Sequence, residues 1–149
     1  MSNSPKMSRL IKPTTDTPFH IDYEWWRREG RDLRSYLISQ LPSDVRDAYA
    51  DLGSNSLIDS VDPNTGEVKQ ADGLLMRIRA IAKQRSDFIS DRTSIIDAVF
   101  RTFLVNDNEP LTVHQLSQRL NRDAQLILRT LSGAQIYKGL RPHVVTERN

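Results

Sequence analysis

Apolar residues recur at helical spacing along most of the chain, and residues that start or stop helices bound each run. The pattern predicts a helix over residues 24–41, capped by Asp22 and ended by Pro42. A short second helix is expected from Ser43 to a stop at Gly53. The inward-facing positions of this helical hairpin are Trp26, Leu33, Leu37, Leu41, Val45, Ala48, Tyr49 and Leu52.

The pattern changes in the middle of the chain. Pro63 and Gly66 bracket a turn, which predicts a small β-hairpin near residues 58–70. Asp72 can then cap a third helix over 73–85 that has one apolar and one basic face. The basic positions are Arg77, Arg79, Lys83 and Arg85. Such a run fits either contacts with phosphate groups or an ordinary solvated helix face.

A fourth helix is predicted over residues 95–105, and it is the most apolar segment of the chain. Ser94 and Asp97 have the spacing of a capping box at its start, with Asp in place of the preferred Glu. Its expected buried positions are Ile96, Val99, Phe100, Phe103 and Leu104.

Residues 111–131 predict two short helices joined by a tight turn. Thr112 and Gln115 form a second capping box, and Asn121 tolerates the left-handed conformation that ends a helix. Asp123 can cap the next helix at once. The apolar positions of the pair are Leu116, Leu120, Ile127 and Leu131. Two helices joined this closely must cross rather than lie side by side.

This stretch resembles the winged helix-turn-helix superfamily over about residues 94–145. The resemblance rests on Thr112, Leu116 with Ser117, Leu120 with Asn121, Asp123, Ile127 and Arg129. It implies that residues 136–145 form a short two-stranded wing. The predicted fold class is therefore mainly α, with a flexible arm over 1–18, a helical region with a hairpin over 19–91, and a winged-helix-like domain over 92–149.

The resemblance also implies a non-catalytic protein that binds nucleic acid, most simply DNA, with RNA as another target. The second helix of the pair would be the recognition helix. Gln125 and Arg129 would read base edges, and Arg122, Lys138 and Arg141 would contact phosphates. Leu128 on the same face suits a protein partner better than a phosphate backbone.

An alternative function is that of an adaptor or accessory subunit in a larger protein assembly, with the winged helix and the N-terminal arm as its docking surfaces. The formal net charge is only +2, from 21 Lys and Arg against 19 Asp and Glu. Trp25 and Trp26 point about 100° apart on a helix, so either both pack in the core or one is an exposed anchor for a partner. Sequence reasoning leaves both functions open.

Other chemistry finds little support in the sequence. The chain has no cysteine, no Gly-rich phosphate loop and no signature of nucleophilic catalysis, so we expect no enzyme activity and no cofactor. His20, His114 and His143 are far apart in sequence, and residues 62–73 lack the ligands of a calcium loop, so no metal site is predicted. Without a signal-peptide core or a membrane-length apolar run, a cytoplasmic location is expected, with no membrane partner or small-molecule substrate.

Overall fold

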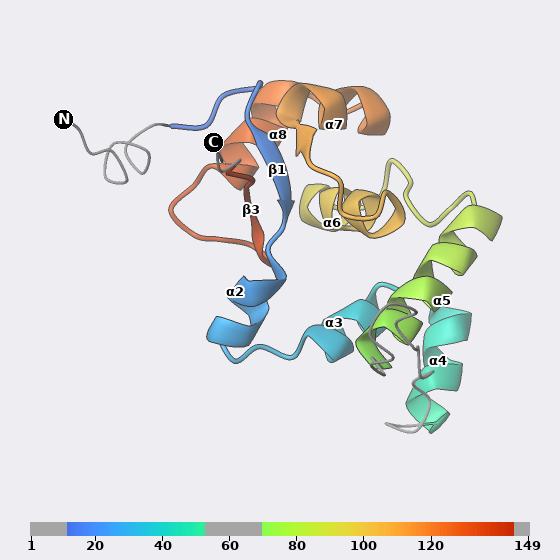
Figure 1. Ribbon diagram of the computed structural model, residues 1–149. Coiled ribbons are helices and arrows are strands. Elements are labelled where there is room, and N and C mark those ends of the chain that lie inside the picture. Colours follow the sequence, from blue (N-terminus) through green and yellow to red (C-terminus); the bar gives the residue numbers. More distant parts are fainter. Residues whose placement is uncertain (1–11, 53–69, 145–149) are drawn as a thin grey trace.

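The computed structural model describes residues 12–52 and 70–144, which form a mostly helical structure with one small antiparallel sheet (Figure 1). The helices are α2 (Tyr23–Arg28), α3 (Leu33–Ser39), α4 (Ser43–Leu52), α5 (Gln70–Gln84), α6 (Ile95–Val105), α7 (Val113–Leu120) and α8 (Ala124–Leu131). The strands are β1 (Pro18–Ile21), β2 (Leu111–Thr112) and β3 (Leu140–Pro142). The mainly α class is confirmed, whereas the hairpin expected near 58–70 lies largely outside the described residues.

The prediction of a single helix over residues 24–41 is wrong, because the chain forms two helices there, α2 and α3. Gly30 takes a left-handed conformation with φ of 63°, which interrupts the helical path after α2. The Asp32 carboxylate then accepts a hydrogen bond from the Ser35 amide and starts α3 as its N-cap. A positive-φ glycine followed closely by a capping residue therefore outweighs the apolar periodicity that runs through both segments.

The sheet has β1 at its centre, with β2 on one side and β3 on the other. Phe19 lies opposite Leu111 in β2 and opposite Pro142 in β3, and both pairings are antiparallel. Residues 136–144 thus supply one strand that pairs with β1, in place of the two-stranded wing expected there. Phe19 and Ile21 point into the core while His20 points outward, so β1 shows the alternation of a half-buried strand.

Asn108 completes the pairing of β1 where β2 ends. Its side-chain carbonyl oxygen accepts a hydrogen bond from the Ile21 amide at 2.8 Å, and its side-chain nitrogen donates to the Ile21 carbonyl at 2.9 Å. Asn108 and the preceding Asp107 both have positive φ, a conformation that asparagine and aspartate tolerate better than most residues. The turn after α6 therefore acts as a one-residue strand beside β1.

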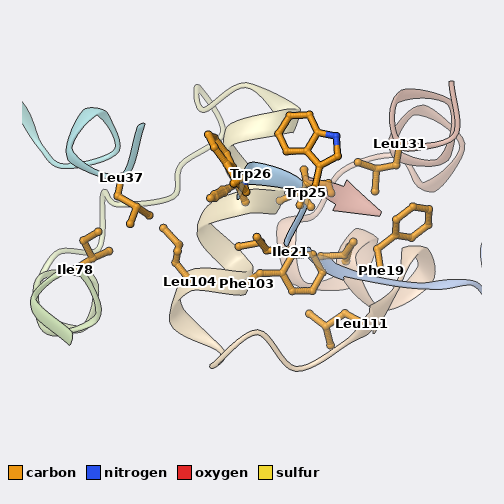
Figure 2. Close-up of a cluster of buried hydrophobic side chains, with 14 of the residues drawn as sticks. Phe19, Ile21, Trp25, Trp26, Leu37, Ile78, Phe103, Leu104, Leu111 and Leu131 are labelled. Atoms are coloured by element: carbon orange, nitrogen blue, oxygen red, sulfur yellow. The ribbon is translucent and has the colours of Figure 1, made fainter. Parts of the chain in front are cut away.

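One hydrophobic core joins all parts of the described structure, and α6 runs through it. Figure 2 shows Ile21 of β1 next to Phe103 of α6 and Phe19 nearer to Leu131 of α8, while Leu37 of α3 and Ile78 of α5 reach the same cluster from the other side. The most apolar predicted helix is therefore the central one. Since Phe19 and Ile21 are fully buried, β1 belongs to the same core as the helices.

His20 and His143, which are distant in sequence, meet on the outer face of the sheet. Their ring centroids are 4.7 Å apart in an edge-to-face arrangement. Burial lowers the pKa of His20 below 6.5, and nearby His143 and Arg141 lower this pKa further, while Asp22 partly opposes them. The neutral imidazole of His20 is thus the form that fits the folded sheet.

The Asn108 contact predicts a loss of stability on substitution. Asn108→Gly keeps the backbone conformation but removes both bonds to Ile21, so we expect a loss of about 1–3 kcal/mol in the free energy of unfolding. Asn108→Ala should lose about 1 kcal/mol more, because alanine disfavours positive φ. Urea unfolding measures both variants. Unchanged stability in Asn108→Gly would show that these bonds do not hold β1.

His20 predicts a dependence of stability on pH. Because its folded-state pKa lies below that of the unfolded chain, the unfolded state binds more protons in the window just below pH 6.5. Stability should therefore fall as the pH is lowered from about 7 to about 5. His20→Gln should weaken this fall, which urea unfolding at each pH measures. Equal pH profiles for His20→Gln and the parent would contradict this assignment.

Candidate nucleic-acid interface

The two helices predicted over residues 112–131 are present as α7 and α8. The Thr112 hydroxyl accepts from the Gln115 amide, and the Gln115 side chain accepts from the Thr112 amide, which completes the capping box. Asn121 ends α7 with φ of 54°. Asp123 starts α8 by accepting from the Leu126 amide. Three residues thus turn the chain between the helices, and their caps fix where each begins and ends.

Gln125 and Arg129 lie one turn apart on the exposed face of α8. Within 12–52 and 70–144, neither side chain has a hydrogen bond or ion pair to another residue, so both are available to a ligand. Leu128 is half-buried and packs against the core. The exposed apolar residue of α8 is Leu126, which retains 39% of its surface, rather than Leu128.

Arg122 has a structural role that sequence reasoning did not foresee. Its guanidinium donates hydrogen bonds to the backbone carbonyls of Ser90, Asp91 and Thr93. These contacts fasten the turn between α7 and α8 to the loop before α6. All three bonds come from one nitrogen, Nη2, so the side chain that was expected to contact a phosphate is anchored to this loop.

Lys138 and Arg141 are also paired internally, near α2 and α3. The Lys138 ammonium lies 4.7 Å from the centroid of the Tyr36 ring, a cation–π contact. Arg141 forms an ion pair with Asp22 at 3.1 Å, although its side chain remains 40% exposed. The five predicted residues therefore occupy three settings, and only Gln125 and Arg129 share one free face.

Both tryptophans are buried, with 7% of Trp25 and 4% of Trp26 exposed. The Trp26 indole nitrogen donates to the Lys138 carbonyl at 3.0 Å, and its ring stacks with those of Tyr36 and Phe100. Core packing, one of the two interpretations that the sequence left open, thus accounts for both rings. Neither presents the exposed anchor that partner binding would use.

Basic and acidic residues are unevenly distributed along the chain. Residues 111–144, from β2 through β3, contain five Lys and Arg residues but only one carboxylate, Asp123. That carboxylate is occupied as the N-cap of α8. The near-neutral total for the whole chain therefore hides a basic segment around α7 and α8. Arg119, exposed in α7, is one of these five basic residues and is not among the nucleic-acid contacts predicted from the sequence.

This chain matches no family model, no curated protein and no solved structure in the comparisons made. Among residues 12–52 and 70–144, no group of three potential metal-binding side chains gathers. No helix in that same part of the chain has both the length and the apolarity needed to cross a bilayer.

The Arg122 contacts predict a destabilised variant. Arg122→Ala should lower the free energy of unfolding by about 1–2 kcal/mol, because charge-assisted bonds to three carbonyls are removed at a partly exposed site. Arg122→Lys should restore only part of this loss, since a lysine lacks the planar guanidinium. Thermal and urea unfolding measure the effect, with exposed Arg119→Ala as the control. Equal losses in the Arg122→Ala and Arg119→Ala variants would argue against a structural role for Arg122.

Proposed function

We propose that this chain is a non-catalytic nucleic-acid-binding protein, most simply a DNA-binding one, in which α8 enters the major groove. The observation that carries the proposal is the pair Gln125 and Arg129 on the free face of α8. Glutamine can bond an adenine edge bidentately, and arginine can do the same with a guanine edge. Residues one turn apart on a helix can reach neighbouring base pairs together.

We further propose that α6, β2, α7, α8 and β3 form a winged-helix-like unit, with β1 completing the sheet. The order of these elements and the short turn before α8 support this arrangement. The excess of basic residues over 111–144 supports binding to a polyanion. With Arg122, Lys138 and Arg141 engaged inside the chain, few free cations remain near α8 among the described residues, so binding should depend only moderately on salt.

A second candidate function is docking to a protein partner. The observation that favours protein docking is a group of apolar side chains that each keep more than a third of their surface exposed. They are Leu126 of α8 and, in the loop that follows this helix, Ile136 and Tyr137. Exposed apolar side chains of this size are more typical of protein interfaces than of contacts with phosphates. If the chain docks to a protein partner in this way, it is an adaptor or accessory subunit.

Binding to duplex DNA over a salt series tests the proposed function. The logarithm of the affinity should fall linearly with that of the salt concentration, with a slope of about −2 to −3 for two or three phosphate contacts. Gln125→Ala and Arg129→Ala should each weaken binding by about tenfold. Arg46→Ala, in α4 and distant from α8 in Figure 1, is the matched control and should bind as the parent does.

Absence of binding at low salt would exclude DNA as a ligand of this chain. Equal binding by Arg129→Ala and the control would exclude α8 as the contact surface even if DNA binds elsewhere. Either result would favour the protein-docking function. That function in turn predicts that Leu126→Ser impairs partner binding without changing the free energy of unfolding by more than a few tenths of a kcal/mol.

A further inference from the structure

A groove with an apolar floor lies beside the turn between α7 and α8. Two adjoining hollows, of about 470 Å³ and about 260 Å³, share Ile89 and Val105 as lining residues. Leu120 of α7 lines the larger hollow, and Lys83 of α5 lines the smaller one. The two hollows thus form one groove that runs from the end of α5, across the end of α6, to the end of α7.

The floor of this groove is built from side chains that are anchored but not covered. Ile89, Val105 and Leu120 are each half-buried and pack against the core cluster. One side of each residue is therefore fixed by the core, while another side faces the groove. A floor of this kind can receive an apolar side chain without rearranging the fold.

The rim of the groove is predominantly basic. Lys83 lines the smaller hollow and Arg119 lines the larger one. Within the described part of the chain, neither the Lys83 ammonium nor the Arg119 guanidinium forms an ion pair or a hydrogen bond. Arg85 is held by Asp44 and Asp87, and Arg122 by backbone carbonyls, so these two cations are fixed in place. Among the residues that line the groove, Asp91 is the single carboxylate.

Beyond the proposed nucleic-acid function, we propose that this groove binds a segment of a partner protein in which leucine-like side chains are flanked by carboxylates. The apolar floor accepts the apolar side chains, and the free cations at the two ends attract the carboxylates. A phosphate backbone would satisfy the cations but would leave the apolar floor uncovered. The combination of floor and rim therefore favours an acidic peptide over nucleic acid at this site.

Nuclear magnetic resonance of the methyl groups of Ile89, Val105 and Leu120 in the full chain tests this proposal. The probes are three synthetic peptides of equal length, which alternate Glu with Leu, Glu with Ser, or Lys with Leu. We expect the Glu–Leu peptide to shift these methyl signals saturably and the other two peptides to shift them little. The double variant Lys83→Glu with Arg119→Glu should weaken binding of the Glu–Leu peptide by about tenfold or more.

Arg77→Glu is the matched control, because Arg77 is an exposed arginine on α5 that does not line the groove. It should bind the Glu–Leu peptide as the parent does. The proposal is overturned if the Glu–Leu peptide leaves the three residues unperturbed, if the Glu–Ser peptide binds equally well, or if the control variant loses as much affinity as the double variant. Displacement of the Glu–Leu peptide by duplex DNA, with the same methyl signals shifted, would also overturn it and assign the groove to nucleic acid.

Discussion

The position of β1 at the centre of the sheet is the constraint on which the rest of the structure depends. This short strand is bonded to β3 on one side and to β2 and Asn108 on the other, so both of its edges are satisfied. Phe19 and Ile21 are thereby placed in the core, with Ile21 beside Phe103 of α6. Since α2 and α3 follow directly, the pairing of β1 also brings the aromatic rings of the N-terminal region onto the core.

A second consequence of this pairing concerns the loop after α8. Gly139 has φ of 76°, and a side chain there would lie 2.8 Å from the Trp26 indole nitrogen, so the backbone approaches the ring as only glycine allows. The neighbouring Lys138 carbonyl accepts the indole hydrogen bond. The segment that follows the proposed recognition helix is therefore held by residues from the opposite end of the chain. Its position is set by tertiary contacts rather than by a local hairpin.

The features that could be predicted from the sequence are those whose causes are local. The capping residues of α7 and α8 and their apolar spacing identified both helices, and the same spacing placed Gln125 and Arg129 on an exposed face. β1 was missed because its alternation covers only four residues, and its stability comes from partners about ninety to 120 positions away. The internal bonds of Arg122 were missed for the same reason, because a basic residue in a turn gives no local sign of a distant carbonyl partner.

Arg122 also determines how the two proposed binding surfaces are related. Its backbone belongs to the turn before α8, while its guanidinium donates hydrogen bonds to the loop at 90–93, which borders the groove. The exposed face of α8 and the groove are therefore connected through the Arg122 side chain. If both surfaces are used, a protein segment in the groove would be held at a fixed position relative to nucleic acid on α8. Charge also favours a protein segment in the groove and nucleic acid on α8. An acidic segment is attracted to Lys83 and Arg119 but is repelled by the phosphates beside Arg129.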